Sequence, residues 1–252
     1  MSDLPPPIPA ATLVLMRPRA GGPPELLMME RTGDMAFAAG ALVFPGGRIE
    51  PQDREAAAEL AGGSETEAAK IAAIRETLEE TGIAAGLDPL PAGAAPARLR
   101  ERLLAGIPFG DLLRESGIGL ALDSLVPFAR WCPNFKETRR FDATFFLAEA
   151  APGGAEPSAQ PGEASRTFWA SAAEVIAEID AGRAHAIFPT RRNLERLARF
   201  RSFAEAREDA HKHEVRTITP WVERRAGREF VCIPENAGYP VTCEPLETAR
   251  RR

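Results

Sequence analysis

The sequence is poor in the residues that build zinc sites and disulfide frameworks. It has only three cysteines and three histidines, and no two cysteines form a CxxC pair. The three cysteines, Cys132, Cys232 and Cys243, lie at irregular spacings, which is atypical of the disulfide-rich secreted class. We therefore expect a reducing compartment and no zinc site. Cys132 ends an apolar run after Trp131, which favours a buried, inert thiol over a nucleophile.

Long apolar runs and a strong charge of one sign are also missing. No stretch approaches the roughly 18 apolar residues of a membrane-spanning helix, and we find no signal peptide and no Ser-Lys-Leu ending. The net charge is −5, and the basic residues are scattered apart from Arg191-Arg192 and the last three positions of the tail. This pattern argues against nucleic-acid binding. We expect a cytoplasmic protein with neither a nucleic-acid nor a membrane partner.

The chain has enough apolar residues for an ordinary globular core. Hydrophobic residues make up 44% of 252 positions. The apolar runs that read as strands are 11–16, 26–31, 40–44, 125–131, 140–148 and 166–169, with shorter ones at 215–218 and 230–233. Helical spacing is found from Ser64 onward and at 97–104, 109–115, 172–179, 190–200 and 203–211. This mixture of elements predicts an α/β fold.

Three glutamates are crowded into little more than one helical turn. Glu76, Glu79 and Glu80 occupy the i, i+3 and i+4 positions of one helix face, and Gly82 follows as a helix terminator. Each like-charge pair at this spacing costs about a few tenths of a kcal/mol in an exposed helix, and more where water is excluded. The cluster therefore indicates a divalent metal ion. The alternative is a solvated acidic helix face.

The surrounding residues resemble the Nudix box, G-x5-E-x7-R-E-U-x-E-E-x-G-U, where U is apolar. The segment from Glu67 through Arg75 to Ile83 matches its second half at every defined position except the first U, where Thr77 stands. The glycine half departs from the pattern, because Gly47 lies twenty residues before Glu67 where the family usually leaves six. An insertion within 51–64 would explain this gap, and its polar, alanine-rich composition suggests a surface excursion.

The resemblance implies a Nudix α/β/α sandwich with a mixed sheet. We expect the Nudix domain to span 10–187, with insertions at about 51–64 and at about 95–120, the latter helical. Residues 188–252 form a C-terminal extension that packs on the core. Within the extension, the segments 188–190 and 238–240 are candidate walls of a substrate cleft, with a turn or packing role as the alternative.

The resemblance also implies a metal site for Mg²⁺ or Mn²⁺. The implied ligands are Glu76, Glu79, Glu80, Glu67 and a carbonyl of Gly47. Glu67 has a second interpretation, because Ser64-Glu65-Thr66-Glu67 has the form of a capping box, and a regular helix from Ser64 would turn Glu67 away from the metal face. Arg75 is expected to anchor the neighbouring carboxylates and the glycine loop.

Other residues are assigned by the same resemblance. Glu163 precedes a strand that ends near Trp169 and is expected to complete the metal site or act as general base, with a helix glutamate such as Glu76 or Glu79 as the other base. The alternative for Glu163 is a solvated loop residue. Substrate contacts are expected from the residues Arg31, Arg140, Gly46 and Gly47, with Arg139 as a further phosphate-binding candidate that could instead pair with an acid.

The segment before the box indicates a branch of the family. Arg31-Thr32, Gly40 and Phe44-Pro45-Gly46-Gly47 follow the spacing of a motif associated with coenzyme A-cleaving members, although Ala36 replaces its second arginine. Later segments resemble the branch of the mammalian peroxisomal coenzyme A diphosphatase. The implied substrate is coenzyme A or an acyl-CoA. ADP-ribose, NADH and a non-catalytic ligand-sensing role remain alternatives, and a homodimer is one option for the assembly.

Overall fold

The computed structural model describes residues 5–33, 38–134, 140–151 and 155–251, without the side chains of residues 250 and 251. Ala36 and Arg139, which entered the sequence analysis, lie outside these ranges. None of the described helices combines the length and apolar character that a membrane crossing requires.

A mixed sheet of eight strands forms the middle layer. Its strands are β1 (Ile8–Arg17), β2 (Glu25–Arg31), β3 (Leu42–Val43), β4 (Gly46–Arg48), β7 (Val126–Trp131), β8 (Phe141–Glu149), β9 (Ala164–Ser171) and β10 (Thr217–Ile218). They run in the order β10-β7-β8-β1-β2-β3, while β4 pairs with β1 and β9 pairs with β2. The pairs β1–β8 and β7–β10 are parallel, and the other pairs are antiparallel.

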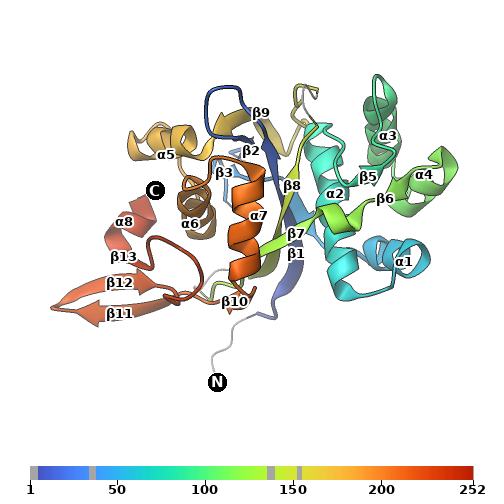
Figure 1. Cartoon of the computed structure of the whole chain (residues 1–252). Coiled ribbons are helices and arrows are strands. Elements are labelled where there is room, and N and C mark those ends of the chain that lie inside the picture. Colours follow the sequence, from blue (N-terminus) through green and yellow to red (C-terminus); the bar gives the residue numbers. More distant parts are fainter. Residues whose placement is uncertain (1–4, 34–37, 135–139, 152–154, 252) are drawn as a thin grey trace.

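Helices cover both faces of this sheet (Figure 1). One face carries α1 (Pro51–Leu60), α2 (Glu65–Thr81), α3 (Ala95–Leu104) and α4 (Phe109–Ser116), and the other carries α5 (Ala172–Asp180), α6 (Phe188–Leu197) and α7 (Phe203–Lys212). Strand β1 supplies both cores because its side chains alternate. Leu13 and Leu15 belong to the cluster under α2, whereas Val14 and Met16 belong to the cluster with α6. This arrangement confirms the predicted α/β/α sandwich.

The segment 51–64 is mainly helical. Most of it is α1, which has Pro51 at its first position and buries Asp53, Ala56 and Ala57. The helix packs against α2 and α4. Its alanines permit this close approach, while its polar residues apart from Asp53 are exposed or half-buried. Strands β5 (Leu87–Asp88) and β6 (Gly119–Leu120) pair with each other in a small antiparallel sheet. In the sequence, β5 precedes α3 and β6 follows α4.

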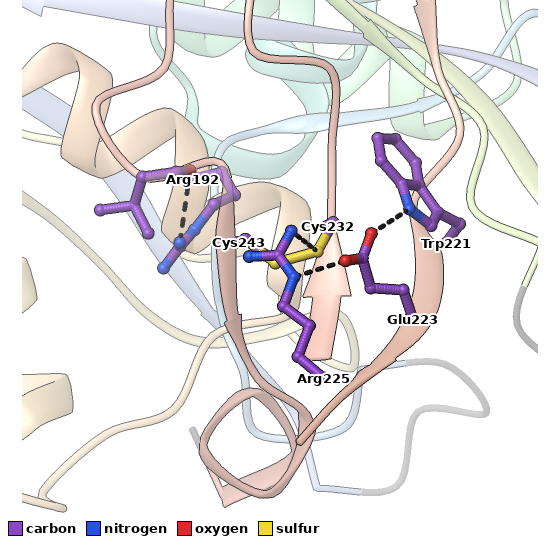
Figure 2. Close-up of a disulfide and its surroundings, with 7 residues drawn as sticks. Arg192, Trp221, Glu223, Arg225, Cys232 and Cys243 are labelled. Carbon is purple, nitrogen blue, oxygen red and sulfur yellow. Dashed lines mark hydrogen bonds and ion pairs between the residues drawn. A yellow bond between two sulfur atoms is a disulfide. The ribbon is translucent and has the colours of Figure 1, made fainter. Parts of the chain in front are cut away.

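The C-terminal residues form a separate small sheet. It consists of β11 (Trp221–Arg225), β12 (Arg228–Cys232) and β13 (Cys243–Pro245), followed by α8 (Leu246–Arg251). Cys232 and Cys243 lie opposite each other in the β12–β13 register and form a disulfide (Figure 2). Because Cys232 and Cys243 are paired, they no longer support the prediction of a reducing compartment. Cys132 is free and buried, as expected.

A buried polar chain fastens this extension to the main sheet. The indole N–H of Trp131 on β7 donates to the Tyr239 hydroxyl at 3.0 Å, and that hydroxyl donates to Oδ1 of Asn193 on α6 at 2.7 Å. Arg196 on α6 donates to the Phe128 carbonyl at 3.0 Å. Because these groups are buried, losing one partner would leave another unsatisfied, and the chain therefore fixes where the extension sits.

Candidate active site

Helix α2 carries the three crowded glutamates, and both of its ends follow from the sequence. Ser64 caps the first turn by accepting from the Glu67 N–H, and Gly82 ends the helix in the left-handed region at φ 72°. One face of α2, which includes Ile71, Ile74 and Leu78, is fully buried against the sheet. The opposite face therefore holds its carboxylates towards the β4 segment and the glycine loop.

Arg75 is the centre of the local hydrogen-bond network. Its Nε and Nη2 donate to the two oxygens of Asp53 at 2.8 and 2.9 Å, and Nη2 also donates to the Arg48 carbonyl at 3.1 Å. Its Nη1 donates to Glu76 at 3.0 Å and to Glu79 at 2.9 Å. Arg75 and Asp53 are almost completely buried. As expected, Arg75 anchors the neighbouring carboxylates and the strand that follows the glycine loop.

Asp53 was missed by the sequence analysis, although a signal for it exists. It stands six positions after Gly47, which is the spacing that G-x5-E assigns to its glutamate, with aspartate in place of glutamate. Counted this way, the insertion follows Asp53 and separates it from Arg75. The bidentate pair shows that the fold closes this gap, because α1 brings Asp53 directly against α2.

The predicted metal role of Glu67 is wrong. Glu67 lies in the first turn of α2, where its side chain accepts from the Gly62 N–H at 2.9 Å and from the Ser64 N–H at 2.8 Å. These backbone bonds, with that of Ser64 the largest influence, lower the pKa of Glu67. A regular helix with about 1.5 Å rise per residue puts Glu67 roughly 13 Å before Glu76 along the axis. Glu67 therefore caps the helix and does not join the cluster.

The glycine loop approaches two of the glutamates closely. The Gly46 N–H donates to Glu80 at 2.8 Å. A Cβ added to Gly47 would lie 2.3 Å from Oε1 of Glu76, so no side chain fits there unless Glu76 moves. The small residues thus bring backbone groups close to the carboxylates. The predicted contacts of Gly46 and Gly47 with substrate and metal remain predictions.

Burial and mutual repulsion raise the pKa values of the three carboxylates. Burial is the largest cause that raises the pKa of Glu76 to about 7 and the pKa of Glu79 above its usual range. The pKa of Glu80 lies well above its ordinary value, first because of burial and then because of the charge on Glu76. The Glu163 carboxylate, just before β9, adds to the repulsion on all three. Glu163 therefore faces the same centre.

The donor set fits a hard divalent cation in its chemistry. Within the described ranges, no group of three His, Cys, Asp or Glu side chains is arranged to hold a metal ion. Part of the reason is that Arg75 holds one oxygen each of Glu76 and Glu79. The ligand atoms are nevertheless carboxylate oxygens, which Mg²⁺ and Mn²⁺ prefer. The raised pKa values show that the negative charges of the cluster are unfavourable. A bound cation would neutralise these charges, as a proton does.

A cavity of about 700 Å³ opens beside these carboxylates. Glu76, Glu80 and Glu163 line it, together with Arg31 and Arg140. Among the described residues, the Nε atoms of both arginines are buried and have no hydrogen-bond partner. The cavity therefore joins an acidic centre to two arginine side chains.

The remaining walls of the cavity are mainly apolar and come from distant parts of the chain. The first turn of α6 contributes 188–190, as the sequence analysis considered, whereas 238–240 do not line the cavity. Further lining residues that the sequence analysis did not name are His185, Val222, Val231, Leu246 and Ala249. No local motif marks these positions, and four of the five reach the cavity only through the packing of the extension.

We expect Asp53→Asn to lower the free energy of unfolding by about 3–5 kcal/mol, because it leaves the Arg75 guanidinium buried without its carboxylate. Urea denaturation measures the change. Asp111→Asn is the matched control, since the Asp111–Arg114 pair is exposed and should contribute less than about 1 kcal/mol. Equal, small effects of the two substitutions would contradict the anchoring role of Asp53.

The metal-free protein should lose stability as the pH rises from about 4.5 to about 7, the ordinary and folded pKa values of Glu76. The folded state binds more protons than the unfolded state in this window. The stability that protonated Glu76 contributes is therefore complete below pH about 4.5 and is lost as the pH rises through about 7. The expected loss from Glu76 is about 3 kcal/mol. Urea denaturation in chelator measures it, and Glu76→Gln should flatten the profile. An unchanged profile in that variant would refute the assignment.

Comparisons with known proteins support one fold family. No family model matches the chain, and no curated protein matches it either. Among solved structures, the crystal structure of a NUDIX hydrolase from Alicyclobacillus acidocaldarius is similar, with 26% identity and a TM-score of 0.70. The match covers 81% of this chain and 96% of that chain.

Two looser likenesses are the Caenorhabditis elegans Ap4A hydrolase, in a binary complex, and the NUDIX domain of Shewanella oneidensis NrtR, complexed with ADP ribose. The first has 17% identity, a TM-score of 0.39, and coverage of 69% of this chain and 86% of that one. The second has 12% identity, a TM-score of 0.44, and coverage of 76% and 86%. At these TM-scores the two structures resemble the chain only loosely. The fold shared with the Alicyclobacillus hydrolase, together with the glutamate helix and glycine loop, supports the Nudix superfamily for this chain.

Proposed function

We propose that this hydrolase cleaves the diphosphate bond of a nucleoside diphosphate linked to a group X, and that its substrate is coenzyme A or an acyl-CoA. The observation that carries the proposal is the single cavity that Glu76, Glu80, Arg31 and Arg140 line together. A diphosphate needs positive charge and hydrogen-bond donors on its oxygens, and a cleavage site needs carboxylates. Both are present in one cavity.

The arginines would hold the substrate. Guanidinium groups bind phosphate oxygens through two parallel hydrogen bonds, and Arg31 and Arg140 both line the cavity. Arg31 is also close enough to Glu80 for its charge to oppose the effects of burial and Glu76 on the pKa of that carboxyl. This proximity supports a role for Arg31 in binding an anion next to the glutamates, where it would hold the diphosphate.

The glutamates would supply the ligands of a cation. Glu76, Glu79 and Glu80, with the Gly47 carbonyl, are the groups that would hold Mg²⁺ or Mn²⁺. When bound, the cation would neutralise the diphosphate and lower the pKa of a water molecule. This requires Glu76 and Glu79 to exchange their bonds with Arg75 at least in part, which the buried Asp53 permits because it keeps the guanidinium charge paired.

The bond cleavage itself needs a base. Glu163 lines the cavity and is only partly buried, so its carboxylate is placed to accept a proton from the attacking water, with Glu76 or Glu79 as the alternative base. The water oxygen forms a bond to one phosphorus, the bond from that phosphorus to the bridging oxygen breaks, and the bridging oxygen leaves with the other phosphate. From coenzyme A the products are 3′,5′-ADP and 4′-phosphopantetheine.

We expect Glu80→Gln to lower kcat by about 10²–10³-fold, because a cation contributes several kcal/mol to the transition state and one of its ligands loses its charge. Glu67→Gln is the matched control on the same helix and should stay within about twofold of the wild type, since Glu67 only helps to cap the helix. Steady-state kinetics with Mg²⁺ or Mn²⁺ measure both. A loss of activity in Glu67→Gln equal to that in Glu80→Gln would restore the metal role for Glu67.

The substrate is tested with coenzyme A, an acyl-CoA, ADP-ribose and NADH as separate substrates, with products identified by mass. Metal-dependent release of 3′,5′-ADP from coenzyme A by the wild type, and not by Glu80→Gln, is the expected result. Cleavage confined to ADP-ribose or NADH would keep the chemistry and contradict the substrate. Binding without turnover of any of them would contradict hydrolysis and favour a sensing role.

A further inference from the structure

We infer that the first turn of α6 is a second anion-binding subsite of the cavity, and that it binds a phosphate monoester elsewhere on the substrate than the diphosphate. The inference rests on the proposed function, because it identifies which nucleoside diphosphates the same cavity prefers. Residues 186–190, which include the N-cap and first turn of α6, line the cavity that Glu76 and Glu80 also line. The two ends of the site are thus connected by one space.

The start of α6 has donors without acceptors. The first N–H groups of a helix have no partner within the helix. The N-cap residue, Ile187, supplies no side-chain cap, and the first turn contains no acidic residue. Pro189 has no N–H, so the donors offered by this turn are the amides of Phe188 and Thr190. Together with the helix dipole, they favour an anion.

Thr190 provides an independent indication of a ligand. It is only 3% exposed, and it lines the cavity. In the described part of the chain, its hydroxyl has no hydrogen-bond partner. The two other buried threonines, Thr77 and Thr81, both donate to the carbonyl four residues before them. The Thr190 oxygen is not among the buried polar atoms that lack a partner, so it is reached from the cavity, where a ligand can accept from it.

The neighbouring cations are engaged elsewhere. Arg191 pairs with Asp180 at 2.9 Å and with Glu195 at 2.8 Å, and Arg192 pairs with Glu195 at 2.7 Å. These contacts turn both guanidinium groups towards acidic partners. Recognition at the start of α6 therefore depends on the two amides and the Thr190 hydroxyl, three donors that suit the oxygens of a tetrahedral phosphate.

Aromatic rings in the cavity walls suit a nucleobase beside this phosphate. Trp131 and Phe188 meet edge to face with their centroids 6.0 Å apart, and Phe44 and Phe145 do so at 6.4 Å. All four line the cavity. A ligand with a diphosphate, an aromatic base and a separate phosphate monoester has a matching surface for each part. The 3′-phosphorylated adenosine of coenzyme A is such a ligand, whereas ADP-ribose and NADH lack the separate phosphate.

The test compares coenzyme A with 3′-dephospho-coenzyme A as substrates of the wild type, Thr190→Val and Thr190→Ser. Hydrogen bonds to a charged group predict that the wild type prefers coenzyme A by about 10–100-fold in kcat/KM. Thr190→Val, which keeps the shape and removes the donor, should lose most of this preference through a higher KM for coenzyme A. Thr190→Ser should retain it. Thermal unfolding verifies that the variants are folded.

Two results would overturn the subsite while leaving the proposed function intact. One is equal kcat/KM values of the wild type for the two substrates, and the other is a fall of both values by the same factor in Thr190→Val. If neither substrate is cleaved, the proposed substrate fails, and calorimetric titration with 3′,5′-ADP and 5′-AMP decides the subsite separately. Tighter binding of 3′,5′-ADP that Thr190→Val abolishes supports it, and equal binding of the two nucleotides overturns it.

Discussion

The buried guanidinium of Arg75 is the constraint on which the candidate site depends. It has five N–H donors, and the contacts to Asp53, Arg48, Glu76 and Glu79 employ all of them. Burial works against its charge, but the bonds to Asp53 and the adjacent carboxylates hold its pKa above the usual range. One side chain therefore joins α1, β4 and α2, and only arginine has the planar fork that these partners require.

Arg75 leaves the acidic cluster only partly neutralised. It bonds to Glu76 and Glu79, whereas Glu80 accepts from the Gly46 N–H and is repelled by Glu76 and Glu163. The fold thus tolerates a carboxylate that would be more stable with a proton or a cation beside it. Perturbed carboxylates in a cavity are typical of functional sites. The same repulsion that weakens the metal-free protein is what would give a cation its affinity.

The fold and much of the site could be predicted because their signals are local. The capping box at Ser64 and the glycine at position 82 mark both ends of α2, and the apolar runs mark the main strands. The errors arose where the information is non-local. Whether Asp53 or Glu67 belongs with Arg75 depends on where a helix is inserted, and the pairing of Cys232 with Cys243 depends on a strand register.

The separation between chemistry and selectivity follows from how the cavity is built. The carboxylates and Arg75 belong to α2 and its glycine loop, whereas the α6 turn and the C-terminal sheet supply walls that no box motif describes. These two parts pack on opposite faces of the sheet, with Leu13 and Val14 of β1 in different cores. A substitution in α6 can therefore alter which diphosphate is held without disturbing the glutamates. On the proposed function, the identity of X would be set by residues far from the motif that indicates the chemistry, which is why the motif alone could not predict it.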